Sequence, residues 1–281
     1  MYIAVIPFAH SYSTEPYTYS VPELWCESII LGCLVEIPFG KKEDFGIVVD
    51  CTDSDVKAWD IRTIRPIIRV VASVELLSHE QRMMILHLAG RFFLSLDRVL
   101  SLFLPTPLMN RLDRKNYILY RENLSERNVS TQPIRSIHYF RDHAFGLSDF
   151  EKLLLPWTVM VVPDDFFLYT FTEKLSINTG TLPAEATPVR KAWFWMNTYE
   201  GKEKIIVWTR RLLYYNLASY ERVYFIEDAF GDEDYQYPIR IRNRDVLRIF
   251  ADTTSLDVTI ITSSPTLDTF AYFRDFTIIT Q

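Results

Sequence analysis

The chain has 281 residues, of which 48% are hydrophobic, 15% aromatic and 23% charged, and its formal net charge is -6 at pH 7. This composition excludes a largely disordered chain, and the length has room for two ordinary domains. The acidic balance excludes a diffuse, non-specific nucleic-acid coat, so any contact with DNA must be local.

The sequence also argues against export and against a structural metal. No apolar run is long enough to span a bilayer, and the N-terminal segment lacks a basic signal region, which predicts a cytoplasmic protein without membrane contact. The three cysteines, Cys26, Cys33 and Cys51, lack the CxxC spacing of a zinc site. They are predicted to be reduced and mostly buried.

The first hundred residues alternate short β-like runs with turn signals. The runs lie in residues 2–8, 17–22, 33–40, 45–51 and 64–71. A helical pattern follows, starting at the helix-capping residue Ser78, and Pro105 and Pro107 are predicted to end that helix. We therefore expect a small β-rich, barrel-like domain with a C-terminal helix over residues 1–105.

Residues 106–135 are polar and charged with one short apolar patch, which suits a connector or a strand pair. Beyond them, β-like runs alternate with helical stretches, the pattern of parallel βαβ units. The strands are predicted within 157–163, 204–209, 222–228 and 257–264, and the helices within 188–201 and 243–254. Residues 136–281 thus form one parallel α/β lobe, and the fold class is α/β with two domains.

A nucleotide-binding lobe of this kind needs a phosphate loop with two glycines five positions apart, followed by Lys and Ser or Thr. None of the eight glycines has this spacing, and the closest pair is Gly40 and Gly46. Where the loop would precede the strand at 157–163, the sequence reads DHAFGLSDFE (142–151), with one glycine and no lysine. We therefore predict a lobe that lacks a phosphate loop and holds no cofactor.

Several segments, in their order along the chain, resemble helicase lobe 1 of the primosomal protein N′ (PriA) family of replication-restart helicases. They are VVPDD (161–165), residues 178–215, VYFIEDAFGDEDYQ (223–236), PIRIRNRDV (238–246) and TSSPTLDTF (262–270). The segments YTYSVP, GCLVEIPFGKKEDFGIVV, IRPIIRVV and LAGRFFLSLDRVLSLFLP resemble the family's 3′-DNA-binding domain. The resemblance implies a RecA-like lobe, and a protein that binds DNA 3′ ends, forks or single strands beside replication-restart or single-stranded-DNA-binding proteins.

Departures from the family pattern predict an inactive relative. The family's Asp-Glu pair reads Glu227-Asp228 here, and Trp208 replaces the glycine of the family's GTR motif. The resemblance leaves no room for a winged-helix domain in residues 106–135, and the chain ends before a second lobe and its zinc-binding cysteines. Glu227 and Asp228 are interpreted as a remnant, so we expect no catalytic residue, no metal and no ATPase activity.

The family's site for a terminal nucleotide carries over to four positions. Tyr17 corresponds to an aromatic residue that can stack on a base, and Thr18 to an aspartate whose loss removes a carboxylate acceptor. Gly40 corresponds to a glycine that leaves space for the strand end, and Arg65 to a lysine that neutralises a phosphate. Tyr19 adds a second ring. From the residues alone, the alternative is that one of the two tyrosine rings lies in the core.

Two basic groups are further candidates for contacts with DNA phosphates. Lys41 and Lys42 lie on a predicted hairpin turn, although two acidic residues follow them directly. Arg240, Arg242 and Arg244 alternate in PIRIRNRD, where they can line one side of an extended segment or pair with the acids that precede them.

Two other functions stay open at this point. The chain can be an interaction scaffold with a vestigial DNA site, which the pI near 5.5 favours. It can also be one lobe of a split ATP-dependent helicase, in which a partner chain supplies the missing lobe and phosphate loop.

Overall fold

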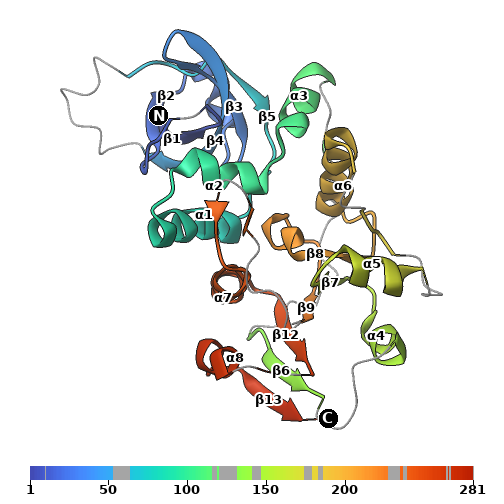
Figure 1. Cartoon of the computed structure of the whole chain (residues 1–281). Coiled ribbons are helices and arrows are strands. Elements are labelled where there is room, and N and C mark those ends of the chain that lie inside the picture. The colour runs from blue at the N-terminus through green and yellow to red at the C-terminus, as the bar shows by residue number, and fades with distance from the viewer. Residues whose placement is uncertain are drawn as a thin grey trace. The chain divides into compact units, whose positions relative to one another are not determined.

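The structure of the protein, a computed structural model, divides into two compact units, Met1–Leu119 and Tyr120–Gln281, and each unit has its own main sheet (Figure 1). The structure describes residues 1–9, 11–52, 64–115, 119, 132–140, 147–173, 179–182, 186–226, 235–236, 239–263, 265 and 267–280. Within these ranges no helix combines the length and the apolar character needed to cross a lipid bilayer.

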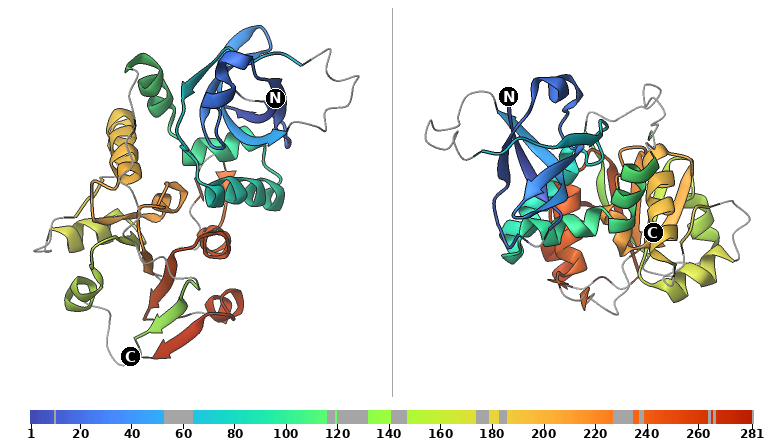
Figure 2. Two further views of the ribbon diagram at one scale, coloured as in Figure 1. Left: turned by 180° about the vertical axis from the view of Figure 1, so that it is seen from behind. Right: turned by 90° about the horizontal axis from the view of Figure 1, so that it is seen from above.

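The sheet of the first unit is antiparallel and closes on itself. Its strands are β1 (Tyr2–Pro7), β2 (Tyr17–Ser20), β3 (Leu34–Phe39), β4 (Lys42–Thr52) and β5 (Arg69–Ala72), in the order β2-β1-β4-β3-β5. The chain before β5 returns to β2, where Ser20 N–H donates to the Arg65 carbonyl and Ile67 N–H donates to the Ser20 carbonyl, both at 3.0 Å. These bonds join the two edges of the sheet, which confirms the predicted barrel-like domain (Figure 2).

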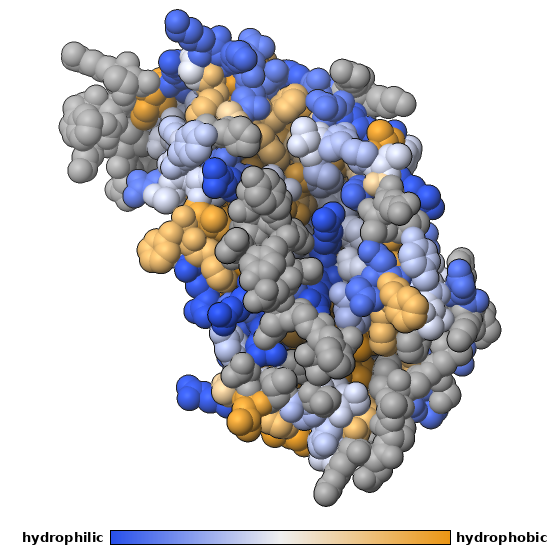
Figure 3. Space-filling view, in the orientation of Figure 1, coloured by the Kyte–Doolittle hydropathy of each residue, from blue (hydrophilic) through white to orange (hydrophobic). Residues whose placement is uncertain are grey.

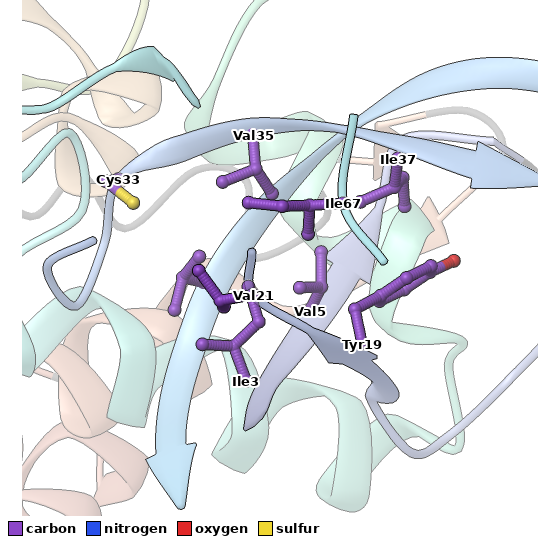
Figure 4. Close-up of a cluster of buried hydrophobic side chains, with 9 residues drawn as sticks. Ile3, Val5, Tyr19, Val21, Cys33, Val35, Ile37 and Ile67 are labelled. Carbon is purple, nitrogen blue, oxygen red and sulfur yellow. The ribbon is translucent and has the colours of Figure 1, made fainter. Parts of the chain in front are cut away.

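Alternate side chains of the strands fill the interior of this barrel, as the two-residue period of a strand requires. The buried members of the cluster are Ile3, Val5, Tyr19, Val21, Cys33, Val35, Ile37, Val48 and Ile67. Figure 4 shows Tyr19 at one end of the cluster and Cys33 at the other, with the tyrosine hydroxyl directed away from the aliphatic side chains. Gly46 belongs to this packing, because a Cβ there would lie 2.3 Å from Cγ1 of Val5.

The cysteines differ in exposure. Cys33 is buried, and burial raises the pKa of its thiol to about 11, which keeps the thiol protonated at neutral pH. Cys26 is only partly buried and Cys51 is exposed. The expectation of mostly buried thiols therefore holds for Cys33 alone.

The helical region after the barrel contains a break that the sequence pattern did not predict. A capping box starts α1 (His79–Phe92), because the Ser78 hydroxyl accepts from Gln81 N–H at 3.3 Å and Ser78 N–H donates to Gln81 Oε1 at 3.1 Å. The helix ends at Phe93, whose φ of 51° is left-handed, and α2 (Leu96–Phe103) follows. The expected single helix is therefore wrong.

The segment expected to be a connector or a strand pair begins instead with a helix, α3 (Thr106–Lys115). Pro107 lies in the first turn of α3, where a missing N–H removes no intrahelical bond, so this proline does not prevent a helix there. Arg69 ties α3 to the barrel, since its guanidinium pairs with Glu36 at 2.6 Å and with Asp113 of α3. This helix therefore packs with the first unit.

The second unit contains a six-stranded parallel sheet. Its strands are β6 (Arg135–Tyr139), β7 (Thr158–Val162), β8 (Ile205–Thr209), β9 (Arg222–Ile226), β12 (Asp257–Thr262) and β13 (Thr277–Thr280), in the order β13-β6-β12-β9-β7-β8. All five neighbouring pairs in this order are parallel. The four predicted strands are present as β7, β8, β9 and β12, which confirms the predicted α/β lobe, whereas β6 and β13 were not predicted.

Helices connect these strands, as in other parallel α/β sheets. They are α4 (Leu147–Leu153), α5 (Asp165–Thr172), α6 (Pro188–Glu200), α7 (Asn243–Thr253) and α8 (Leu267–Tyr272). Short elements accompany them: the 3-10 helices η1 (Glu23–Ser28, in the first unit) and η3 (Arg210–Tyr214), and the strand pair β10 (Tyr235–Gln236) and β11 (Ile239–Arg240). The predicted helices correspond to α6 and α7.

Arg135 is the first residue of β6, and its side chain binds the main chain at the C-terminal end of α7. Its guanidinium donates to the carbonyls of Ala251, Thr254 and Leu256 at 3.0, 2.7 and 2.5 Å. A cation at a helix C-terminus also complements the helix dipole. We expect Arg135→Ala to lower the free energy of unfolding by about 2–3 kcal/mol, because several carbonyls lose a charged donor.

Urea unfolding followed by circular dichroism measures this loss. Arg135→Lys is the matched control, because lysine keeps the charge without the forked donors, and it should fall between the wild type and the alanine variant. Equal stability of all three proteins would contradict the assigned role of Arg135.

Candidate functional site

The two tyrosines of β2 lie on the same face of the strand. Tyr17 is paired with Val5 and Tyr19 with Ile3, and both partners belong to the barrel interior. Tyr19 is only 5% exposed, and its hydroxyl donates to the Pro38 carbonyl at 3.3 Å. A base cannot stack on so deeply buried a ring, so the structure places Tyr19 in the core and leaves Tyr17 as the ring that a ligand can reach.

The ring of Tyr17 is oriented by a contact with a neighbouring aromatic ring. Its ring meets Phe39 edge to face, with centroids 5.3 Å apart and planes at 89°. This arrangement fixes the orientation of the tyrosine ring without covering it completely, because the residue is only partly buried.

Thr18 points away from the interior, and its main-chain N–H and C=O point away from β1, two residues before the bonds of Ser20 that close the sheet. In an antiparallel pair, residues whose N–H and C=O point toward the partner strand alternate with residues whose groups point away from it. Ser20 uses its outward-facing groups to bind Arg65 and Ile67. Thr18, two residues earlier and paired with Ala4, has the same orientation. Among the residues that the structure describes, no partner continues the ladder at Thr18.

Gly40 and Arg65 lie near this part of β2. Gly40 is the first residue of the two-residue turn between β3 and β4 and has a φ of 61°, which favours glycine and fits a type II′ hairpin. A Cβ at Gly40 would meet no described protein atom within 4 Å, so the glycine is explained by its backbone and not by packing. The exposed Arg65 leans over the turn, and its Nη1 donates to the Gly40 carbonyl at 3.0 Å.

Asp44 adds a carboxylate to the same end of the barrel. It is paired with Ile37, so its side chain lies on the interior face, where Ala9 N–H donates to Oδ2. Burial raises the pKa of Asp44, and hydrogen bonds from Phe45 and Ala9 offset part of the rise. The bond from Ala9 anchors the loop between β1 and β2 to the β3–β4 hairpin.

Several of the groups described above shift the pKa of the Tyr19 hydroxyl. Burial raises the pKa of Tyr19 to about 12, Arg65 lowers it, and Tyr17 and Asp44 raise it further. The raised pKa keeps this hydroxyl a neutral donor at physiological pH. We call Tyr17, Thr18, Gly40, Asp44 and Arg65 the strand-edge site.

The lysines of the hairpin lie beside the strand-edge site. Lys41 is the second turn residue, and Lys42 is paired with Phe39, which packs against the interior cluster. Glu43 is paired with Pro38 and lies on the opposite face from Asp44, so the two acids that follow the lysines do not act as one group. Both lysines are exposed and can attract phosphates.

The arginines of residues 240–244 do not share one extended segment. Arg240 ends β11, with only its main chain described, whereas Arg242 is the N-cap of α7 and Arg244 belongs to that helix. The guanidinium of Arg244 lies 5.9 Å from the centroid of the Tyr272 ring. Arg240 and Arg244 therefore belong to different elements, and a common row of the three side chains stays a prediction.

The predicted remnant of a nucleotide site is only partly visible. Glu227 and Asp228 lie outside the described residues, directly after β9. The segment 142–151 includes the first residues of α4, and its residues 142–146 are also outside the described part. Trp208, at the family's glycine position, is buried and packs against Phe194 and Tyr215, with centroids 5.2 and 5.3 Å apart. An aromatic cluster therefore occupies that part of the lobe.

Two groups of the site were not identified from sequence. The outward direction of the Thr18 main chain depends on which strands pair, and this information is absent from a side-chain pattern. Asp44 could have been found, because a two-residue turn at Gly40 and Lys41 places residue 44 opposite the apolar Ile37. Among the described residues, no group of three or more His, Cys, Asp or Glu side chains is placed to hold a metal ion.

Comparisons with known proteins bear on the first unit. Residues 5–105 match the family model of the PriA 3′DNA-binding domain (3′BD). No curated protein matches the chain. Among solved structures, the C-terminal domain of the DEAD-box protein Dbp5 is similar, with a TM-score of 0.39 and 10% sequence identity over 54% of this chain and 91% of that chain. The matched residues 5–105 contain every member of the strand-edge site.

Proposed function

We propose that the PriA-type 3′-DNA-binding domain formed by residues 5–105 directs this protein to DNA 3′ ends, at forks or on single strands, in replication restart, without unwinding the DNA. The observation that carries the proposal is that, among the described residues, no main-chain bond continues the sheet at Thr18, next to the partly exposed ring of Tyr17 and close to Arg65 on the turn at Gly40. One surface thus offers a donor, an acceptor, a stacking face and a positive charge.

Each group has a distinct task in this proposal. The ring of Tyr17 stacks on the terminal base, and Arg65 neutralises the phosphate that precedes the terminal nucleotide. The N–H of Thr18 donates to that phosphate or to the base, and its carbonyl accepts from the 3′-hydroxyl. The position of Gly40 adds no side chain to the space above the turn.

The proposal also accounts for the loss of the family's aspartate at position 18. A carbonyl on an open strand edge accepts from a hydroxyl as a carboxylate does, and it needs no particular side chain. A terminal phosphate would instead bring its own acceptor oxygens and negative charge toward this carbonyl and toward Asp44. The site therefore favours a free 3′-hydroxyl.

A fluorescence-anisotropy titration tests the proposed function. The full chain is titrated with a fork that has an exposed 3′ end, with a single strand and with a blunt duplex, over a series of salt concentrations. We expect tighter binding to the fork and the single strand than to the duplex, and a salt dependence too shallow for a broad phosphate surface. Equal, steeply salt-dependent binding to all three DNAs would reject end recognition.

We further propose that the lobe formed by residues 136–281 does not hydrolyse ATP. The support is the sequence, which has no phosphate loop, because magnesium held by Glu227 and Asp228 without bound phosphates would be weak. We expect no DNA-stimulated phosphate release above the buffer background. Turnover that disappears in Glu227→Ala would contradict this expectation, whereas nucleotide-dependent DNA release only with a purified partner would favour a helicase completed by that partner.

A further inference from the structure

Two aromatic side chains of the first unit combine strong exposure with an unusual backbone. Tyr12 is 75% exposed and Phe93 is 93% exposed. Their φ angles are 54° and 51°, in the left-handed region that favours glycine or asparagine. Neither burial nor backbone preference explains an aromatic residue at these positions, and such combinations are concentrated at functional sites.

The two rings lie on segments that are bonded to each other. Ser11 Oγ donates to Asp97 Oδ1 at 3.1 Å, and Leu96 N–H donates to the Ser13 carbonyl at 3.0 Å. Tyr12 lies between these anchors, and Phe93 opens the short turn that leads to them. The loop that carries Tyr12 is therefore fixed to the turn between α1 and α2.

The positive charge of an arginine lies beside the ring of Tyr12, and this combination suits a ligand that carries both phosphates and planar bases. The Arg98 guanidinium carbon lies 5.8 Å from the centroid of the Tyr12 ring. An arginine that supports an aromatic ring leaves the other face of the ring available to a base, and it attracts the neighbouring phosphates. Figure 3 shows hydrophobic side chains in separate groups among hydrophilic ones on the face that it draws.

The same loop connects the two strands that reach the strand-edge site. At its start, Phe8 N–H donates to the Phe45 carbonyl at 2.9 Å, and Ala9 N–H donates to Asp44. At its end it enters β2 at Tyr17. A DNA strand whose terminus lies at Tyr17 can therefore run along this loop toward Tyr12.

We infer that Tyr12 and Phe93, supported by Arg98, form a second DNA contact of this domain: a stacking platform for unpaired bases that precede the 3′-terminal nucleotide. The inference rests on the proposed function, because a bound terminus sets the direction of the strand. The platform recognises single-stranded DNA by base stacking without sequence preference.

The test uses substitutions that suit the left-handed backbone. Phe93→Gly and Tyr12→Asn remove the rings and relieve the backbone strain, so each variant should unfold at the same temperature as the wild type or higher. Single strands with a 3′-hydroxyl, from two nucleotides to about 16, are titrated against the full chain. Phe166→Ala, which removes a 79% exposed ring from α5, is the matched control.

We expect wild-type affinity to rise with strand length and then level off. In the Phe93→Gly, Tyr12→Asn double variant, affinity for the longest strands should fall at least about fivefold, which corresponds to the loss of one stacked base. Its affinity for the dinucleotide should not change. The fluorescence of a 2-aminopurine base placed at successive positions of the strand reports stacking on protein rings. With the double variant, the quenching seen with the wild type should be lost at interior positions and kept at the 3′ terminus.

The outcomes separate the two proposals. A wild-type protein that binds no 3′-ended DNA rejects the proposed function itself. End-selective binding with the same length dependence in the wild type, the double variant and Phe166→Ala rejects only the platform, and the two rings would then serve another ligand, such as a protein.

Discussion

Arg65→Glu is expected to weaken binding to 3′-ended single strands by about 10- to 100-fold, because a charged hydrogen bond to phosphate is replaced by repulsion. Arg65 is exposed, and its side chain donates to the Gly40 carbonyl at 3.0 Å at the surface, so its replacement should leave the barrel intact. Anisotropy titration measures the loss. Arg65→Gln should also reduce the slope of log K against log salt by about 0.7.

Arg190→Glu is the control for this charge reversal. Arg190 is an exposed residue in the first turn of α6, where an acidic residue is compatible with the helix dipole. The control makes the same change in net charge in the other unit and should bind DNA like the wild type. If both reversals weakened binding equally, the role of Arg65 would be only its contribution to the overall charge.

Thr18→Pro is expected to reduce affinity for a 3′-hydroxyl end about tenfold or more, because proline removes the main-chain N–H that we assign to the ligand. The sheet should tolerate this proline, because β2 is the outer strand of the order and the Thr18 N–H does not point toward β1. Circular dichroism establishes that the barrel is still folded, and anisotropy measures the affinity.

Thr18→Ala separates the main chain from the side chain. Alanine keeps the N–H and removes the hydroxyl, so this variant should bind nearly as tightly as the wild type. A folded Thr18→Pro protein with unchanged affinity would show that the strand edge is not used. A large loss in Thr18→Ala would instead assign the contact to the hydroxyl.

The sequence predicted features that depend on neighbouring residues. The strands of the barrel follow from apolar alternation between turn residues, and the start of α1 follows from Ser78 and Gln81, whose reciprocal bonds are local. The helices of the second unit are bounded by local signals too, since Thr187 caps α6 and Gly201 ends it with a φ of 70°.

Structural features that depend on residues distant in the sequence could not be predicted from local patterns. The apolar pattern continues through Phe93, and nothing in its neighbours signals a left-handed residue. β6 has the polar sequence RSIHY, and it is a strand because β12 and β13 pair with it on both sides. Ser136 of β6 even shares a hydrogen bond of 3.0 Å with Thr259 of β12.

The candidate site shows the same division. The resemblance to the family predicted Tyr17, Gly40 and Arg65 as site residues, and in the structure Arg65 Nη1 donates to the Gly40 carbonyl. The residues alone could not decide which tyrosine is buried, because that depends on which face of β2 meets β1. The main chain of Thr18 became visible as a site only once the order of the strands was known.

The most direct measurement compares two forks that differ only in the leading-strand terminus, one with a 3′-hydroxyl and one with a 3′-phosphate, in competition for the 281-residue chain. Because the Thr18 carbonyl can accept from a hydroxyl and repels phosphate oxygens, we predict that the hydroxyl fork displaces the phosphate fork at equal concentration. Equal retention of the two forks would contradict the recognition of 3′ ends by this protein.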